Sequence, residues 1–335
     1  MIYSFQLCPH ANIRYTEALS MLGKKELDCL LQSLGIVAQT QIIQRQKSIF
    51  YRFEAQELTK EQCLTLQHHS SLLLLCEERE GLLWPMPLED IAYLPADLSE
   101  VLKYKGKTSA RFTQMMITCA CAAGNLFSRP SLTVLDPLCG RGTTLFCALQ
   151  SGYSAIGLDT DKSAIREADS YFTRYLEMHT LKHQRTQGSS TLGGQGIPRV
   201  AFTLADTKEH YRAGDTRTLA LYTGDTALTS SLLKKTPADL LVTDLPYGVQ
   251  HAPGELHGLA SFSGFLRRVL PAWYTGLKKG SVIALSFNTL TLPRAQVVKQ
   301  LEEAGFVPLT QAPYDDFSHR VEQAIVRDFV VALRP

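Results

Sequence analysis

Residues 238–248 (ADLLVTDLPYG) place polar and aromatic groups directly after an apolar stretch. An amine attached to an aromatic ring is a poor nucleophile, because its lone pair is delocalised into the ring. Two acceptors that hold its N–H groups can turn that lone pair toward an electrophilic carbon, and the Asp244 carboxylate and Leu245 carbonyl are such acceptors. Pro246 stiffens the turn, and Tyr247 offers a ring on which a swung-out base can stack. These four residues therefore predict a site that positions an exocyclic amine.

A glycine-containing segment, residues 135–144 (LDPLCGRGTT), follows another apolar stretch. Glycines at a strand-to-helix turn let a ligand approach the backbone, and the helix N-terminus offers N–H groups to it. The segment lacks the Gly-Lys-Ser/Thr of a triphosphate loop and carries an acid before its glycines. That acid suits a cationic amino group such as that of S-adenosylmethionine, whereas a plain tight turn is the alternative. The expected cofactor contacts here are Asp136, Gly140, Gly142, Thr143 and Thr144.

Two further acids follow apolar stretches. Asp159 lies 17 residues after Gly142, a spacing at which a carboxylate can accept hydrogen bonds from two ribose hydroxyls. Asp161 is instead expected to cap the next helix. Asp225 can receive an adenine amino group, or it can simply cap a helix that starts at Thr226. We expect Asp159, Thr160, Asp225 and Thr226 to complete the cofactor site.

From residue 132 onward, apolar strand patterns alternate with helical ones, which indicates a doubly wound, mostly parallel sheet of seven strands. The last two strands have no helix between them, so the final strand is expected to be antiparallel. Residues 186–196 (TQGSSTLGGQG) are rich in Gly, Ser, Thr and Gln and are expected to be a flexible insertion, either disordered or ordered by substrate. The expected strands are 132–136, 155–159, 219–223, 238–244, 281–287, 306–313 and 324–333.

The first 95 residues alternate short strand and helix patterns in the order β-α-β-β-α-β, which is typical of a small ferredoxin-like unit. Residues 84–95 are punctuated by prolines and are expected to be a linker. We therefore predict two domains, with residues 1–95 forming the ferredoxin-like unit and residues 96–335 forming the α/β unit.

Composition sets limits on the class of protein. The chain has 335 residues, of which 45% are hydrophobic and 20% charged, and its formal net charge is +2, as in ordinary globular proteins. The longest apolar run, residues 72–76, falls far short of the roughly 20 residues that span a membrane. The eight cysteines show no zinc-type spacing, and the first residues show no secretory pattern. We expect reduced thiols, no metal and a cytoplasmic location.

Basic residues occur in several clusters, and surface charge explains most of them. The cluster Lys103, Lys105 and Lys107 is the best candidate for contacts to phosphates, because it precedes the helix that opens the α/β unit. His251 is expected to be a loop residue, with the mouth of the substrate site as its alternative place. Residues 317–320 (FSHR) are expected to be polar and exposed between the last two strands near the edge of the pocket, with contact to the substrate as the alternative.

The segments described above resemble those of amino-methyltransferases with the pattern Asp/Asn-Pro-Pro-Tyr/Phe. Among these, they are most similar to the tRNA guanosine-N2 methyltransferase family of archaea and eukaryotes. The N-terminal unit resembles that family's ferredoxin-like domain more loosely, and residues 108–112 resemble its segment against the cofactor, which makes Phe112 a cofactor contact. The matching stretches are DPLCGRGTT at 136–144, GLDTD at 157–161, GDT at 224–226 and TDLPYG at 243–248.

The resemblance implies a class I, Rossmann-like fold that uses S-adenosyl-L-methionine to methylate guanosine N2 in tRNA or another RNA. Two departures bear on the substrate. Residues 76–103 leave no room for the RNA-binding THUMP domain that the family carries, and Leu245 replaces the commoner proline. The alternatives are methylation of adenine N6 in RNA or DNA, methylation of a protein amide, or a non-catalytic scaffold that binds the cofactor or RNA.

Overall fold

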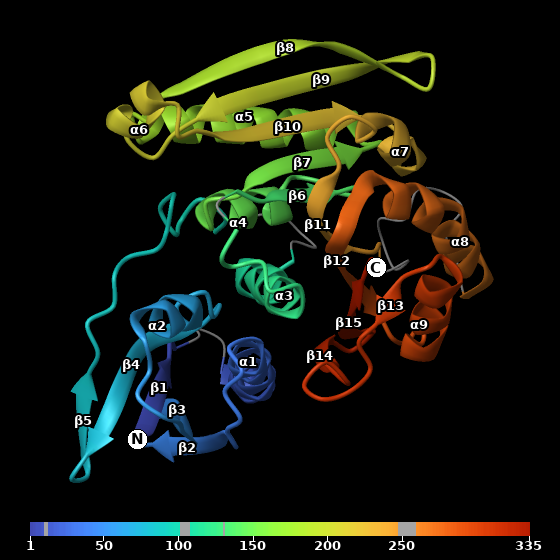
Figure 1. Ribbon diagram of the computed structural model, residues 1–335. Coiled ribbons are helices and arrows are strands. Elements are labelled where there is room, and N and C mark those ends of the chain that lie inside the picture. Colours follow the sequence, from blue (N-terminus) through green and yellow to red (C-terminus); the bar gives the residue numbers. More distant parts are fainter. Residues whose placement is uncertain (10–12, 101–107, 130, 247–258) are drawn as a thin grey trace.

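The structure is a computed structural model that describes residues 1–9, 13–100, 108–129, 131–246 and 259–335, without the side chains of 13–19 and 259–260. Its elements form an N-terminal unit and a larger α/β unit (Figure 1). Within these residues, no helix is both long and apolar enough to cross a membrane.

The N-terminal unit has the strand pairing of a ferredoxin-like unit, as expected. Its antiparallel sheet has the order β2-β3-β1-β4-β5, so β1 lies between β3 and β4. Thr59 caps α2 in a capping box with Gln62, which explains why that helix begins where it does. The elements are β1 (Ile2–Leu7), α1 (Ile13–Ser33), β2 (Gln41–Arg45), β3 (Ser48–Glu54), α2 (Lys60–Leu66), β4 (Leu72–Arg79) and β5 (Leu82–Pro85).

The α/β unit alternates helices and strands along most of its length. It begins with α3 (Ala110–Ala123), β6 (Thr133–Asp136), α4 (Thr143–Gln150), β7 (Ser154–Asp159) and α5 (Lys162–Met178). It continues with β8 (His183–Leu192), β9 (Gln195–Leu204), α6 (Lys208–Ala213), β10 (Arg217–Thr223), a short 3-10 turn η1 (Thr226–Leu228), α7 (Thr229–Leu232) and β11 (Ala238–Asp244). The last elements are α8 (Leu259–Gly276), β12 (Leu277–Asn288), α9 (Arg294–Glu303), β13 (Val307–Pro308), β14 (His319–Glu322) and β15 (Ile325–Leu333).

These strands form one mixed sheet with the order β13-β15-β12-β11-β6-β7-β10-β9-β8, and β14 pairs with β15. The strands from β12 to β10 in this order are parallel, whereas β15 is antiparallel to β12. The α/β class with a Rossmann-like sheet is therefore confirmed. All seven expected strands are present, and the antiparallel final strand is as predicted. The sheet has ten strands rather than seven, because β8, β9 and β14 extend it.

The expected flexible insertion at residues 186–196 is wrong, because these residues belong to a β-hairpin. Strands β8 and β9 pair along ten residues each, and β9 continues onto β10. Gly193 and Gly194 have φ angles of 55° and 81° at the turn, as a two-residue hairpin turn with two positive φ angles requires. Leu192 and Ile197 are buried against Leu158 and Tyr222, which fixes the hairpin to the sheet.

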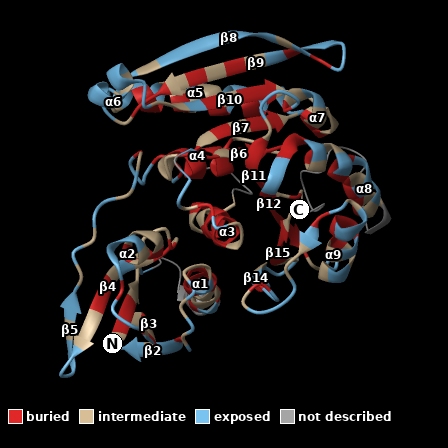
Figure 2. Ribbon diagram, viewed as in Figure 1, coloured by how far each residue is buried: buried red, intermediate tan, exposed pale blue. Residues whose placement is uncertain are grey.

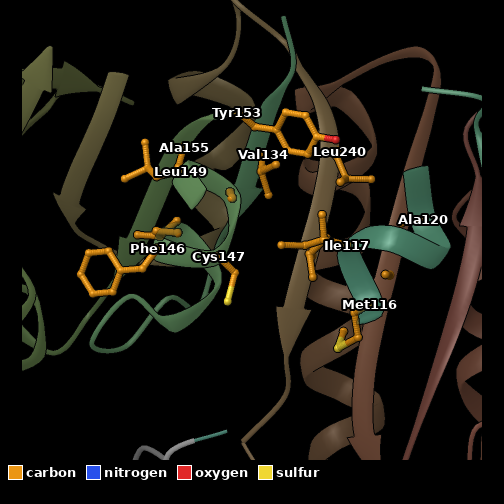
Figure 3. Packing of buried hydrophobic residues seen from close by; sticks show 14 of the residues in the cluster. Met116, Ile117, Ala120, Val134, Phe146, Cys147, Leu149, Tyr153, Ala155 and Leu240 are labelled. Atoms are coloured by element: carbon orange, nitrogen blue, oxygen red, sulfur yellow. The ribbon is translucent and has the colours of Figure 1, made fainter. Parts of the chain in front are cut away.

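Helices cover both faces of the sheet, and its central strands are buried (Figure 2). One face packs against α3, α4 and α5, and the other against α7, α8 and α9. Figure 3 shows Ile117 of α3 near Val134 of β6 and Leu240 of β11. Helix α1 of the N-terminal unit packs against α3, where Leu22 and Cys29 join the same apolar core.

Candidate functional site

The two segments with the strongest chemistry meet at neighbouring strand ends. The hydroxyl of Thr243, beside Asp244, donates a hydrogen bond of 2.7 Å to the Asp136 carboxylate, across 107 positions of sequence. Strand β6 lies between β7 and β11, so the chain leaves it toward one sheet edge and later returns on its other side. In open α/β sheets, a crevice that takes ligands forms where the strand order reverses in this way. The Asp136 and Asp244 segments both border that point.

The glycine turn after β6 has the backbone that its sequence predicts. Gly140 and Gly142 have φ angles of 49° and 90°, and Gly142 is the N-cap of α4. A Cβ atom built on Gly140 meets nothing within 4 Å, so this residue borders open space. Thr143 and Thr144 form the first turn of α4 and are buried. The turn therefore presents backbone toward solvent at a helix N-terminus, which suits a bound ligand.

Asp136 is the buried acid at the end of β6. Only 3% of it is exposed, and Thr243 and the Leu138 backbone N–H both donate to its Oδ1. Burial raises the pKa of its carboxyl to about 6, and hydrogen bonds from Thr243, Thr144 and Leu138 oppose that rise. A cationic ligand group would compensate the cost of holding this carboxylate in its charged form.

Asp159 joins the end of β7 to the glycine turn. Its Oδ2 accepts a hydrogen bond of 2.8 Å from the Gly140 N–H, and its Oδ1 accepts one of 2.9 Å from the Asp161 N–H. A carboxylate can accept about four hydrogen bonds, so these contacts leave capacity for ribose hydroxyls. Thr160 is exposed beside it. Asp161 caps α5 through Ser163 and Ala164, which confirms its expected role.

Asp225 is found in the alternative role that its sequence left open. It caps the η1 turn by accepting from the Ala227 N–H at 2.8 Å, and its carboxylate pairs with Arg268 at 3.1 Å. Its side chain is 48% exposed, so a ligand can still reach it. Thr226 is buried, and its hydroxyl accepts a hydrogen bond of 2.8 Å from the Trp273 indole. Cofactor contact stays a prediction for both residues, and for Thr226 the structure shows a packing role.

Asp244 ends β11 beside the glycine turn and is partly exposed. The Thr108 hydroxyl donates to its Oδ2, and the Arg327 guanidinium lies 3.9 Å from the same oxygen. Leu245 is buried, its N–H donating at 2.9 Å to the Ser286 carbonyl, which holds the turn onto β12. Pro246 follows at half-buried exposure. The predicted contacts Tyr247, His251, Lys103, Lys105 and Lys107 lie outside the described residues.

Phe112 of α3 packs against the β14–β15 hairpin. It is buried, its ring centroid is 5.1 Å from that of His319, and the Arg327 guanidinium lies 5.0 Å from the ring. The expectation that residues 317–320 are polar and exposed is wrong for Phe317 and His319, which are 1% and 7% exposed. They are buried because β14 pairs with β15 and turns them toward Phe112 and Phe329. Contact between Phe112 and a cofactor stays a prediction.

Solved methyltransferases resemble this chain. The match with TrmN from Thermus thermophilus has 14% identity and a TM-score of 0.40. It covers 91% of this chain and 64% of TrmN, so this chain spans less than two thirds of the length of TrmN. The rRNA methyltransferase AviRa from Streptomyces viridochromogenes matches at 16% identity and a TM-score of 0.40, covering 70% of this chain and 89% of that one. The magnesium protoporphyrin IX methyltransferase ChlM from Synechocystis PCC 6803, with bound SAM, matches at 16% identity and a TM-score of 0.39, covering 69% and 87%. No protein-family model and no curated protein matches the chain.

Sequence reasoning missed Thr243 and Arg327, and it did not assign Thr108 to Asp244. The sequence could have indicated a role for Arg327, because a charged residue inside the apolar stretch 325–333 must find a partner when the strand is buried. It could not have done so for Thr243, because a threonine inside a strand is ordinary. Among the described residues, no cluster of three or more His, Cys, Asp or Glu side chains is placed to hold a metal ion.

A separate cavity of about 690 Å³ lies between the N-terminal unit and the α/β unit, with residues 88–100 along one side. Its lining includes Arg111 together with the acids Glu89, Asp90 and Glu100. That excess of acids disfavours a phosphate backbone, so we do not assign the cavity to nucleic acid.

Proposed function

We propose that the protein is a SAM-dependent methyltransferase that acts on an exocyclic amine of a nucleobase, with guanosine N2 in tRNA or another RNA as its first candidate substrate. The observation that carries the proposal is the Thr243–Asp136 hydrogen bond. It joins the glycine turn, which we propose binds the cofactor, to the Asp244 turn, which we propose positions the amine, at the point where the strand order reverses. A scaffold that only bound a cofactor would not need Asp244 at that place.

The residues around the glycine turn fit S-adenosyl-L-methionine. Gly140 borders open space, which lets a ligand reach the backbone. The buried Asp136 is an anion in need of a cationic partner, such as the amino group of the methionine portion. Asp159 would accept from the ribose hydroxyls and Asp225 from the adenine amino group. The cofactor supplies an electrophilic methyl group on a sulfonium.

The Asp244 turn would hold the target amine. The carboxylate of Asp244 and the carbonyl of Leu245 would accept its two N–H groups and aim its lone pair at the methyl carbon. Proximity and orientation then account for most of the rate. Asp244 need not be a strong base, because the proton can leave after the methyl group arrives. Tyr247 would stack on the base, and this part of the proposal rests on its residue type and on the motif resemblance.

RNA is the proposed partner on the same motif resemblance, with Lys103, Lys105 and Lys107 as candidate phosphate contacts beside the site. The cysteines of the protein are expected to be reduced, and an RNA-modifying protein with reduced cysteines would work in the cytoplasm. Crosslinking the protein to its RNA substrate would identify the residues that hold the RNA.

The proposal is tested by incubating the protein with S-adenosylmethionine labelled on its methyl group and undermodified total RNA, followed by nucleoside analysis. Label in N2-methylguanosine is the expected result. Parallel reactions with undermodified DNA and with a protein pool serve as controls. Label in N6-methyladenosine, or in protein alone, would replace the guanosine assignment. Cofactor binding without transfer to any pool would contradict the enzymatic proposal.

A further inference from the structure

The β14–β15 hairpin brings a buried arginine to the proposed catalytic aspartate. Arg327 is 5% exposed, and one of its guanidinium nitrogens lies 3.9 Å from Asp244 Oδ2. The guanidinium also lies 5.0 Å from the centroid of the Phe112 ring, a distance within the range of cation–π contacts. Arg327 comes from the last strand and Asp244 from β11, with β12 between them in the sheet. The fold therefore builds this pair from segments that are 83 residues apart in sequence.

His319 lies beside this pair and adds no second positive charge. It is the cross-strand partner of Arg327 in the pairing of β14 with β15, and its ring contacts Phe112. Its Nδ1 lies 3.1 Å from the Phe317 carbonyl, which can only accept, so Nδ1 carries the hydrogen. Burial lowers the pKa of His319 to about 4, with the positive charge of Arg327 acting in the same direction. Near neutral pH the imidazole is uncharged, and Arg327 supplies a positive charge beside Asp244.

A buried guanidinium constrains the carboxylate that it faces. Losing one partner of such a pair is costly, because the charge that stays buried loses part of its electrostatic compensation. The Thr108 hydroxyl donates to the same oxygen of Asp244 that Arg327 faces, so contacts from α3's N-terminal side and from β15 converge on Oδ2. Two convergent contacts on one oxygen limit rotation of the carboxylate about its χ angles. Arg327 is itself held by the Phe112 ring and by the strand.

We propose that Arg327 is a positioning residue for Asp244, which it keeps in the orientation that receives the target amine. The proposal rests on the proposed function, because it assigns Asp244 to amine binding. It also makes the β14–β15 hairpin part of the active site, although the hairpin lies far in sequence from both the glycine turn and the Asp244 turn.

The test is a double-mutant cycle with Asp244→Asn, Arg327→Met and the double variant. Arg327→Met should lower kcat roughly 10- to 100-fold, as misplacement of a reacting group does, with little change in the Kd for S-adenosylmethionine or the KM for RNA. In the Asp244→Asn background the same change should have little further effect, because the charge through which Arg327 acts is gone. Arg327→Lys keeps the positive charge and should recover part of kcat.

The same four proteins are compared in urea unfolding, a readout that does not need activity. Asp244→Asn should lower the unfolding midpoint by removing the negative charge that faces the buried guanidinium at 3.9 Å, and adding Arg327→Met should recover part of that loss. Arg294→Met is the matched control, because Arg294 pairs with Asp328 of the same strand at 2.9 and 2.8 Å. It should lower the midpoint without the selective loss of kcat. Binding stoichiometry for S-adenosylmethionine reports the folded fraction, and Arg327→Gln replaces Arg327→Met if the latter does not fold.

Additive effects on kcat in the cycle would overturn the positioning role. So would a rise in KM for RNA at unchanged kcat, because it would place Arg327 against the substrate. If the wild-type protein transfers no methyl group to any pool, the proposed function fails and the positioning role fails with it. In that case coupling in the unfolding cycle would show that the pair is structural only.

Discussion

At the level of single residues, the three strand-end aspartates on β6, β7 and β11 differ in their surroundings more than in their sequence context. Asp136 is buried, and its pKa is raised to about 6. Asp159 accepts hydrogen bonds from two backbone N–H groups of the site. Asp244 faces a hydroxyl and a guanidinium. The same residue type can therefore serve a cationic group, hydroxyl groups and an amine at three neighbouring positions.

Asp136→Asn should make the ligand-free protein more stable at pH 7.5 but not at pH 4. The folded pKa of about 6 lies above the ordinary aspartate pKa of 3.8, so this carboxyl contributes stability at low pH that is lost as pH rises through 6. The asparagine does not titrate, and the difference between the two proteins should grow by at most about 3 kcal/mol over this range. Urea unfolding at both pH values measures it. A difference that stays constant with pH would contradict the buried environment of Asp136.

The same substitution should weaken binding of S-adenosylmethionine roughly tenfold, because a charge-assisted hydrogen bond to the amino group is lost. Calorimetric titration at pH 7.5 measures the Kd. The control is Glu177→Gln, a change at an exposed residue of α5. Unchanged affinity in Asp136→Asn would remove Asp136 from the cofactor site.

Asp244→Ala should lower kcat for methyl transfer by roughly 100-fold or more, as the loss of a preorganised polar group does at other active sites. The Kd for S-adenosylmethionine should change little, because the proposed cofactor contacts lie at or after the ends of β6, β7 and β10 and, for Phe112, on α3. Asp244→Asn is the matched variant and should retain more activity, since its amide oxygen still accepts a hydrogen bond. Full activity in Asp244→Ala would refute the catalytic assignment.

Among the elements, the β8–β9 hairpin shows how pairing overrides composition. Its outer strand is mostly exposed and polar, as the pale edge of the sheet in Figure 2 shows. It is ordered because β9 pairs with both neighbours, buries Ile197 on one face of the sheet and buries Val200, Phe202 and Leu204 in the other core cluster. The Gly193-Gly194 pair is a hairpin signal that could have been recognised in the sequence. Composition alone pointed to a loop, since Gly, Ser, Thr and Gln disfavour a packed core.

Ile197→Ser should release the hairpin from the sheet without unfolding the protein. The substitution removes a side chain that packs against Leu158 and Tyr222 and leaves a small polar group there. Comparable truncations of buried aliphatic side chains cost about 2–5 kcal/mol. Hydrogen exchange over residues 183–204 should therefore speed up, while β6 and β11 stay protected. Gln195→Ser, at an exposed position of the same strand, is the control, and equal exchange in both variants would contradict the packing.

At the scale of the whole molecule, the N-terminal unit is attached to the α/β unit through its contact with α3. Thr118 of α3 donates a hydrogen bond of 2.7 Å to the His68 carbonyl. Glu26 of α1 is fully buried nearby, and both the N–H and the hydroxyl of Ser70 donate to it. Burial raises the pKa of Glu26 to about 8 and lowers that of His69, 3.5 Å away, to about 4. Near neutral pH the contact between Glu26 and His69, both in the N-terminal unit, therefore joins two uncharged groups and is not an ion pair.

Between pH 6.5 and 8, the wild-type protein should lose about 1–2 kcal/mol of stability through Glu26. Its pKa is raised from 4.5 to about 8, so it contributes stability below pH 4.5 that is lost as pH rises through 8. His69 works in the opposite direction, but its contribution is lost only as pH falls below 6.5 toward 4, so it stays constant in this window. Glu26→Gln should show a flatter pH dependence in urea unfolding. The control Glu177→Gln should keep the wild-type slope, and parallel slopes for all three proteins would contradict the prediction.

Sequence patterns were sufficient to predict much of the fold. Periodicity located all seven expected strands of the larger sheet and the order of the N-terminal unit, because alternation and helical faces are local properties of the chain. Asp161 was expected at a helix start and caps α5, since capping involves residues only two or three positions apart. The candidate site residues at strand ends followed from the same rule, because the carboxyl ends of parallel strands share one edge.

Tertiary structure decided which of those residues meet and what they meet. The Thr243–Asp136 bond, the approach of Arg327 to Asp244 and the burial of His319 depend on strand order and on long-range pairing. No local pattern encodes such contacts, because each joins segments far apart in the chain whose side chains share a face only after the sheet forms. Asp225 illustrates the same limit, since its cap is local but its partner Arg268 comes from a distant helix.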